Sequence, residues 1–256
     1  MKKMMICAMC FIGCVTMFVP STHYVKANPK KTSPGTAIFV MAIPQIEPTI
    51  EEKRIIIKRP EIHLDIRIPQ FKNMQDEANL KKLNQLLYKE ANERKQQMFE
   101  LAKEYNKDII KDGLSPILFE YLETYSVIST IKPYLTIETN RYQYSGGAHG
   151  INELSYINWN TETNKQVYIG DLFKKDVDYL QLINSLVKEE ISRRSALGEY
   201  FFSGSDGFQT IQQTQPFYIN KEGDLMIVFN VYEIAPYASG PIYIKLPLMK
   251  LAPYLN

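Results

Sequence analysis

One short stretch alternates strictly between polar and apolar residues, and it constrains the fold more than any other feature of the chain. The stretch is Glu61-Ile-His-Leu-Asp-Ile-Arg-Ile68, and it lies between Pro60 and Pro69. A period of two turns every apolar side chain to one face and every polar side chain to the other. We therefore predict a β-strand with one face on a core, bracketed by the two prolines.

The segment that follows repeats its apolar residues every three or four positions, which is the period of an α-helix. The repeat skips one turn near Arg94-Lys95. We expect a long amphipathic helix over about residues 76–111, with Asn73 as its N-cap and Gly113 as its stop. The expected apolar stripe consists of Leu80, Leu83, Leu87, Ala91, Met98, Ala102, Tyr105 and Ile109.

The second half of the chain is rich in β-branched and aromatic residues, which favour strands. A second helix is expected from Asp176, a suitable N-cap, to Arg194, with Gly198 after its end. Strands and helices do not alternate regularly. The sequence therefore favours an α+β fold with a mixed or antiparallel sheet and one long and one shorter amphipathic helix. Strands are expected at 125–130, 134–142, 154–160, 165–169, 225–229 and 242–246, with a hairpin turn at 161–164 and a mobile loop at 199–215.

The N-terminus has the three-part layout of an export signal. Met1-Lys2-Lys3 is basic, residues 4–19 are apolar apart from Thr16, and Val25-Lys26-Ala27 offers small or aliphatic residues for cleavage. We predict a secretory signal peptide over residues 1–27, followed by a linker and N-terminal extension over residues 28–54. The protein then meets the membrane only during export and works outside the cell or in the cell wall. An uncleaved anchor and a lipoprotein modified at Cys14 are the two alternatives.

Charge and cysteine content exclude several classes of function. The chain has 30 Lys and Arg against 28 Asp and Glu, and without the three lysines of residues 1–27 it is close to neutral. This balance argues against a nucleic-acid partner. All three cysteines also lie in residues 1–27, which leaves no disulfide, catalytic thiolate or Cys-ligated zinc for the rest of the chain. Because no phosphate-binding loop or dinucleotide fingerprint is present, we expect no cofactor and no metal.

Two segments carry the groups best suited to binding. Residues 142–150 place His149 in a glycine-rich turn that permits a close backbone approach. Residues 231–241 form a tyrosine-rich connection between two strands, and tyrosine gives a large contact area at low entropic cost. Both segments also have a structural interpretation, in which His149 bonds a nearby carbonyl and the tyrosines pack on the fold. We predict that the segments lie together, and that the ligand-binding residues are Tyr142, His149, Tyr232, Glu233 and Tyr237.

No residue pattern selects a catalytic mechanism, and we expect no enzymatic activity. Residues 28–256 contain two histidines, His63 and His149, without an HExxH spacing, and no serine lies in a nucleophile-elbow context. A small hydrolase of wall polymer with two catalytic carboxylates stays open, because many acid pairs exist and none stands out. A further alternative is an inhibitor or decoy that inserts a protruding 199–215 loop into a lysozyme cleft, with Phe201, Phe202 and Phe208 as the inserted residues.

Several stretches resemble a pair of domains of unknown chemistry that occurs in exported bacterial proteins. The first part is suggested by Leu64-Asp-Ile-Arg-Ile-Pro69 and Leu83-Asn84-Gln85, and the second by Ser145-Gly-Gly-Ala-His-Gly150, Gly170-Asp-Leu-Phe173 and the loop from Tyr232 to Pro241. The same pair occurs in the extracellular region of the anti-sigma-V factor, which senses lysozyme by binding it. It also occurs in the non-catalytic N-terminal region of a peptidoglycan deacetylase.

The resemblance implies a recognition module at the Gram-positive cell wall, whose partner is a lysozyme-like protein or wall glycan. It implies a first part over residues 55–120 and a second over residues 121–256, merged into one globular unit. Only Met1-Lys2-Lys3 precede the apolar run, so no sigma factor is expected as a partner. The chain ends at Asn256, soon after the resemblance does, so we expect the binding module without a deacetylase domain.

Overall fold

The structure is a computed structural model that describes residues 49–72 and 77–256, all within one compact unit, Ala42–Asn256. The predicted signal peptide, most of the predicted linker and the expected N-cap Asn73 lie outside the described residues. Across the described ranges, no helix is both long and apolar enough to cross a membrane.

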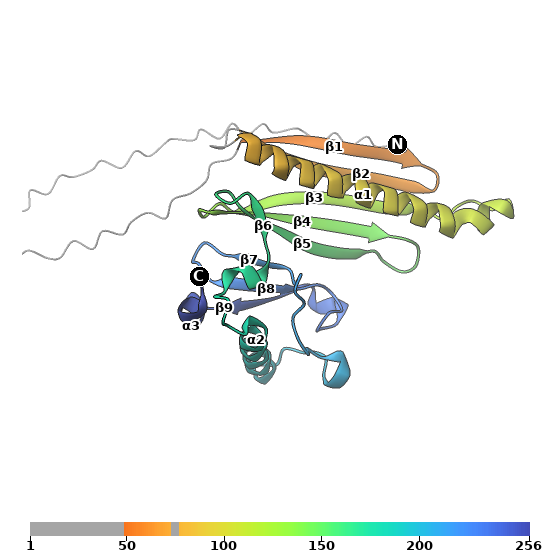
Figure 1. Cartoon of the computed structure of the whole chain (residues 1–256). Coiled ribbons are helices and arrows are strands. Elements are labelled where there is room, and N and C mark those ends of the chain that lie inside the picture. Colours follow the sequence, from red (N-terminus) through yellow and green to blue (C-terminus); the bar gives the residue numbers. More distant parts are fainter. Residues whose placement is uncertain (1–48, 73–76) are drawn as a thin grey trace, which may run out of the picture. The chain divides into compact units, whose positions relative to one another are not determined.

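A six-stranded sheet forms the larger layer, and its strands lie side by side in chain order (Figure 1). Every neighbouring pair is antiparallel except β2 and β3, which run parallel because the long helix α1 (Glu77–Lys111) connects the end of one to the start of the other. The strands are β1 (Thr49–Arg59), β2 (Ile62–Lys72), β3 (Phe119–Ser129), β4 (Tyr134–Tyr144), β5 (Ile151–Asn160) and β6 (Lys165–Val167).

The predicted alternating strand is β2, and its alternation is confirmed. Its first three apolar side chains are at most 1% exposed. The strand does not end at Pro69, however, but continues to Lys72, with Pro69 opposite Glu52 of β1. Because β3 pairs only with Ile62–Ile66, the later part of β2 has β1 as its neighbour in the described sheet. A residue without an N–H is tolerated in such a one-sided stretch.

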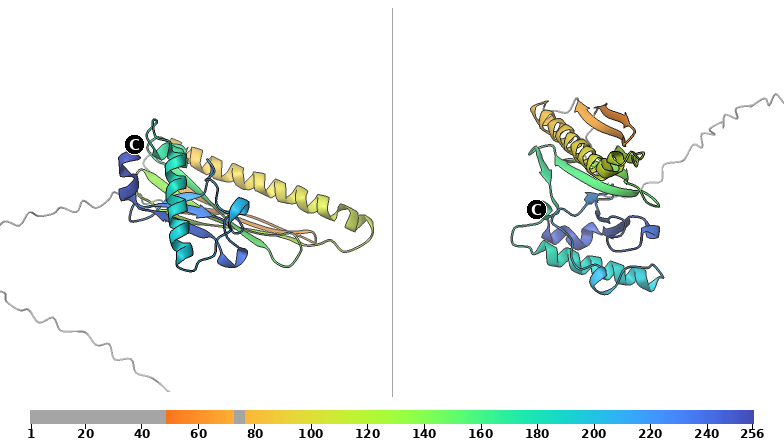
Figure 2. Two further views of the ribbon diagram at one scale, coloured as in Figure 1. Left: turned by 90° about the horizontal axis from the view of Figure 1, so that it is seen from below. Right: turned by 90° about the vertical axis from the view of Figure 1, so that its right-hand side faces the viewer.

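The long helix is confirmed almost to the residue, and it lies along one face of the six-stranded sheet (Figure 2). Leu83, Ala91 and Ala102 are fully buried in the core that α1 shares with the sheet. The helix also stops where expected, since Gly113 adopts a φ of 73° and donates its N–H to the Ile110 carbonyl.

One member of the predicted stripe is wrong. Tyr105 is 52% exposed, and the neighbouring Asn106 takes the buried position instead. The Asn106 side chain accepts a hydrogen bond from Ile117 N–H at 2.7 Å and donates to the Ile117 carbonyl at 2.9 Å. These bonds satisfy backbone groups just before β3, so a polar residue is the better one to bury there.

Strand β1 was not predicted, because most of it was assigned to the linker and N-terminal extension. Its sequence, Thr49-Ile-Glu-Glu-Lys-Arg-Ile-Ile-Ile-Lys-Arg59, mixes charges with an apolar run and lacks a clear period. The strand forms because β2 offers a backbone edge, and ion pairs with β2 support it: Arg54 with Asp65, and Lys72 with Glu51. Tertiary pairing thus overrides a weak local signal.

A second core lies between α2 (Tyr179–Ala196) and a three-stranded antiparallel sheet. The N-cap of α2 is Asp178, which accepts the Gln181 N–H at 3.0 Å, so the predicted cap Asp176 is wrong by two residues. The strands are β7 (Phe217–Ile219), which was not predicted, and β8 (Leu225–Phe229) and β9 (Ile242–Leu246), which were. The short helices are η1 (Ile169–Leu172), η2 (Gly204–Asp206), η3 (Tyr237–Ser239), α3 (Leu248–Leu251) and η4 (Ala252–Tyr254).

The loop 199–215 packs on this second core instead of protruding from it. Phe201 is only 9% exposed, and Ile211 is 2% exposed. Phe208 meets Phe229 of β8 edge to face, with 5.5 Å between ring centroids. Phe201 is buried and Phe208 is partly buried against this core, so neither ring is freely available for insertion into another protein, and the inhibitor or decoy alternative stays a prediction.

Strand β5 joins the two cores because successive side chains point to opposite faces. Ile157 and Trp159 face the α1 core, whereas Asn158 faces the smaller sheet, where its Nδ2 donates to the Phe217 carbonyl at 2.9 Å. Further along β5, the Leu154 N–H donates to Asn230 Oδ1 at 2.7 Å, and Asn230 Nδ2 donates to the Leu154 carbonyl at 3.1 Å. The expected α+β fold with a mixed sheet, one long helix and one shorter helix is confirmed. The predicted division between residues 120 and 121 falls inside β3.

We predict that Asn158→Ala lowers the free energy of unfolding by about 2–3 kcal/mol, because it removes two buried hydrogen bonds and leaves the Phe217 carbonyl without its donor. Chemical denaturation measures the change. The matched control is Asn152→Ala on the exposed part of the same strand, which should change stability by about 0.5 kcal/mol or less. Equal effects of the two substitutions would contradict the role given to Asn158.

Candidate functional site

The two predicted binding segments lie together, and their aromatic rings form a continuous row. The His149 ring stacks on Tyr237 with 4.4 Å between ring centroids and 26° between planes. Tyr237 lies in turn 5.5 Å from Tyr232, and its hydroxyl donates to the Gly150 carbonyl at 3.3 Å. We call His149, Tyr237 and Tyr232 the aromatic row. His149 precedes the two tyrosines by more than eighty residues in the sequence, so the predicted meeting of the two segments is confirmed.

The backbone of each segment explains how the row is presented. Tyr232 adopts a φ of 67°, in the left-handed region that residues other than glycine rarely occupy, and its side chain is 52% exposed. A tyrosine held in this conformation costs free energy that the surrounding loop must supply, which is a common feature of binding sites. In the other segment, Gly147 takes a φ of 94° and allows the tight turn that delivers His149.

Glu233 has a structural task in the same loop. One carboxylate oxygen accepts the Asn230 N–H at 2.7 Å, and the other accepts a hydrogen bond from Gln215 Nε2 at 3.0 Å. Both bonds tie the tyrosine-rich loop to its surroundings. We therefore interpret Glu233 as a residue that positions Tyr232 and Tyr237, and its contribution to a ligand stays a prediction.

Tyr142 also supports the row from behind. Its half-buried ring lies against Gly150, where a Cβ atom would overlap the ring. The contact needs glycine at position 150 because no side chain fits between the ring and the backbone. Tyr142 thus orders the β4–β5 connection, and whether it also touches a ligand stays a prediction.

The His149 ring links this row to a pocket on the other face of the sheet. Its Nδ1 lies 3.0 Å from the Gly150 carbonyl, the kind of contact that the structural interpretation expected. A carbonyl only accepts, so this contact requires the proton on Nδ1 and leaves Nε2 for another partner. His149 also lines a pocket of about 630 Å³ between α1 and strands β3 to β5. We call this cavity the arginine pocket, after its residues Arg94 and Arg141.

A buried ion pair forms one wall of the arginine pocket. The Glu123 side chain is only 4% exposed and accepts two hydrogen bonds from Arg94, at 2.7 and 2.6 Å. Burial opposes the charge of Arg94, but the bonds to Glu123 outweigh it and raise the pKa of Arg94 above its ordinary value. The Tyr121 hydroxyl donates to the same carboxylate at 2.8 Å, and burial together with Glu123 raises the pKa of Tyr121. The Glu123 carboxylate thus joins α1 to β3 at this wall through Arg94 and Tyr121.

Sequence reasoning missed the arginine pocket, although two signals were present. The skipped turn of the helical repeat at Arg94-Lys95 marks the place where α1 turns a guanidinium toward the sheet. On β3, Glu123 continues the alternation of Phe119 and Tyr121 and therefore faces the same core. A positive charge on the buried face of α1 and a negative charge on the facing side of β3 predict a buried ion pair. That prediction can be made only once α1 and β3 are known to pack together.

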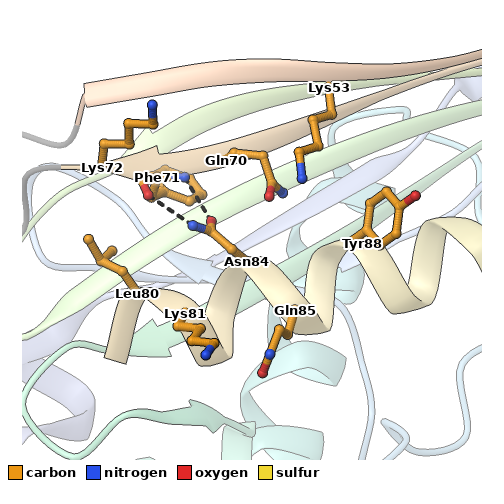
Figure 3. A pocket seen from close by; sticks show the side chains of 9 residues that line it. All are labelled: Lys53, Gln70, Phe71, Lys72, Leu80, Lys81, Asn84, Gln85 and Tyr88. Atoms are coloured by element: carbon orange, nitrogen blue, oxygen red, sulfur yellow. Dashed lines mark hydrogen bonds between the residues drawn. The ribbon is translucent and has the colours of Figure 1, made fainter. Parts of the chain in front are cut away.

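A second pocket, of about 490 Å³, lies between α1 and the β1–β2 hairpin (Figure 3). Its centre is occupied by Asn84, whose amide pairs with both backbone groups of Phe71, at 2.8 and 2.9 Å. Lys53 places its ammonium 5.1 Å from the centre of the Tyr88 ring. The Asn84 contacts give the Leu83-Asn84-Gln85 motif a structural role, because they join the end of β2 to α1.

The described ranges contain no group of three or more His, Cys, Asp or Glu side chains that could hold a metal ion. The His149 ring stacks on Tyr237, and the Glu233 carboxylate accepts hydrogen bonds from Gln215 and Asn230. The arrangement therefore supports stacking and hydrogen bonding with a ligand.

Comparisons with known proteins agree with the resemblance to a peptidoglycan deacetylase. Residues 57–152 match the family described as "Deacetylase PdaC", and residues 170–249 match "Protein of unknown function (DUF3298)". The chain is 26% identical over 128 residues to the peptidoglycan-N-acetylmuramic acid deacetylase PdaC of Bacillus subtilis (strain 168). That alignment covers 49% of this chain and 27% of the deacetylase, so the chain spans about a quarter of that relative's length. The likeness to the anti-sigma-V factor stays a prediction.

Solved structures share the fold. A DUF3298 family member from Bacteroides fragilis superposes with a TM-score of 0.64 at 22% identity, covering 82% of this chain and 94% of that one. A DUF3298 family protein from Pseudomonas aeruginosa superposes with a TM-score of 0.52 at 15% identity, covering 83% and 95%. The chain thus resembles a two-part module in which a PdaC-type segment precedes a DUF3298-type segment.

We predict that Gly150→Ala destabilises the protein by about 2 kcal/mol, because the new methyl group overlaps the Tyr142 ring. The Tyr142→Ala variant removes that ring, so Gly150→Ala should cost much less in its background. A double-mutant cycle followed by thermal unfolding measures the coupling. Additive costs would show that the ring and Gly150 do not press on each other.

Glu123→Gln should lower the free energy of unfolding by about 3 kcal/mol, because Arg94 then loses its buried, bidentate carboxylate partner and keeps only the longer contact with the more exposed Glu90. Glu120→Gln is the control, since Glu120 lies on the same strand and faces the opposite side of the sheet. Urea denaturation of the two variants measures the difference. A similar small effect of both would mean that the buried ion pair adds nothing to the fold.

Proposed function

We propose that this chain is an exported, non-catalytic recognition module that binds the glycan of the bacterial cell wall through the aromatic row. The observation that carries the proposal is the row itself: His149 stacks on Tyr237, Tyr232 lies tilted against Tyr237, and Tyr232 is held exposed in a strained backbone conformation. A fold gains nothing from exposing a strained tyrosine, whereas a binding surface does.

The chemistry of the row suits a sugar polymer. Aromatic faces pack against the apolar faces of sugar rings, and the neighbouring hydroxyl and imidazole groups accept or donate hydrogen bonds. The likeness to a peptidoglycan deacetylase supports a wall polymer as the ligand. The predicted signal peptide supports work outside the cell or in the wall. We name a lysozyme-like protein as the competing partner, because tyrosine-rich loops also bind proteins.

The test is retention of the purified protein on insoluble peptidoglycan, with a lysozyme titration in parallel. Tyr232→Ala should weaken retention about five- to ten-fold, since a lost aromatic contact costs about 1 kcal/mol or slightly more. Alanine keeps the side-chain Cβ, so the backbone demand at position 232 is unchanged. The effect is therefore that of the ring.

The control is Tyr254→Ala. Tyr254 is 40% exposed and lies in η4, at the opposite end of the sheets from the β4–β5 connection (Figure 1). Retention of this variant should stay within about two-fold of the unsubstituted protein. Saturable binding to lysozyme without retention on peptidoglycan would replace the glycan by a protein partner. Release of soluble wall fragments would show a hydrolase instead.

A further inference from the structure

The arginine pocket holds a guanidinium whose donors are mostly unused. Arg141 of β4 has a side chain only 17% exposed, and one of its terminal nitrogens donates to Ser155 Oγ at 2.7 Å. A guanidinium carries five N–H donors. Its buried Nε has no hydrogen-bond acceptor, and the nearest carboxylate oxygens, of Glu123 and Glu153, lie 3.7 Å away.

Those two carboxylates do not neutralise Arg141 well. Glu123 accepts two hydrogen bonds from Arg94, which also pairs with Glu90, and one from Tyr121, so closer donors occupy its oxygens. The Glu153 side chain is 59% exposed, and water weakens its attraction for the guanidinium. Among the described residues, a largely buried positive charge is thus left without a carboxylate within hydrogen-bond distance, and such a charge is costly unless a ligand completes it.

The surroundings of Arg141 form a site of suitable size. The pocket volume of about 630 Å³ lies within the range of small-molecule sites. Gln97 of α1 and Gln143 of β4 supply amides at its wall, and Ser145 supplies a hydroxyl. Met98 and Ile151 add apolar surface. Charge, amides and an apolar wall together are typical of sites that bind a polar, ring-sized ligand.

We propose that the arginine pocket binds a ligand that carries a carboxylate, and that Arg141 is its anion-binding residue. The planar fork of a guanidinium matches the two oxygens of a carboxylate. Gln97 and Gln143 bond the remainder of the ligand. His149 lines both the pocket and the aromatic row, so a carboxylate in the pocket and a sugar ring on the row lie on either side of one residue.

This inference deepens the proposed function and rests on it for the choice of probes. In wall glycan, a free carboxylate comes either from the lactyl group of a muramic acid that carries no peptide stem or from the end of a peptide stem. The probes are therefore free N-acetylmuramic acid and the dipeptide D-alanyl-D-alanine. N-acetylglucosamine, which has the same sugar ring as N-acetylmuramic acid but no carboxylate, is the neutral comparison.

Calorimetric titration of the full chain should show at least one of the two carboxylate probes binding about ten-fold or more tighter than N-acetylglucosamine. Gln97→Glu places a negative charge at the pocket wall and should weaken that binding about five-fold or more. The matched control is Gln96→Glu, on the exposed neighbouring position outside the pocket lining, which should stay within about two-fold. Each substitution creates one pair of like charges four residues apart on α1, with Glu93 or Glu100. Gln96→Glu also removes the 2.9 Å hydrogen bond from the Gln96 amide to Glu100, so the thermal unfolding midpoint of each variant is measured beside its binding.

Arg141→Lys keeps the charge but removes the fork, and it should lose most of the binding while the thermal unfolding midpoint reports its folding. If that variant unfolds, the Gln97→Glu comparison still decides. Failure of both carboxylate probes to exceed N-acetylglucosamine overturns the pocket proposal, as does an equal loss in Gln96→Glu and Gln97→Glu. Retention on peptidoglycan is measured separately through Tyr232. Failure of the arginine-pocket proposal is therefore distinguishable from failure of the proposed glycan binding by the aromatic row.

Discussion

Hydrogen bonds between asparagine side chains and the backbone hold the separate parts of this fold together. A side-chain amide has a donor and an acceptor, as a peptide group has, and it can therefore replace a missing strand neighbour. Asn230 does so with Leu154, which joins the smaller sheet to β5. Asn84 with Phe71 and Asn106 with Ile117 do the same at the two ends of α1. Without these pairs, buried backbone groups would lack partners at every junction between elements.

Strand β5 and its neighbour β4 give the two sites their positions. Alternate side chains of these strands face α1 on one side and the smaller sheet on the other. Arg141 therefore points into the arginine pocket, while the adjacent Tyr142 points to the opposite face and supports Gly150. His149 lies in the connection between the strands, where the two faces meet. The turn at Gly147 thus places His149 where it both lines the arginine pocket and stacks on Tyr237.

Much of the fold follows from periodicity. The alternation in β2, the helical repeat of α1 and the bounds of β8 and β9 were all predictable, because burial of one face imposes a regular pattern. Strand β1 was not predictable, because its sequence has no regular apolar pattern and the strand is supported by ion pairs with β2. The end of β2 was misplaced because Pro69 breaks only strands with neighbours on both sides. Of the candidate site, the meeting of the two segments was predicted, but the supporting tasks of Glu233 and Tyr142 depend on contacts that no local pattern records.

The sequence by itself determined the class of fold, the long helix, the resemblance to an exported wall-associated module and the two segments rich in histidine, glycine and tyrosine. These features are local, because each arises from neighbours along the chain and from side-chain chemistry. Only the tertiary structure decided that His149 stacks on Tyr237, that Arg94 pairs with Glu123 and that the buried Nε of Arg141 lacks a hydrogen-bond acceptor. The two pairs join residues 29 and 88 positions apart, and the strength of an ion pair or a stacked ring depends on burial and distance, which only the packed chain establishes.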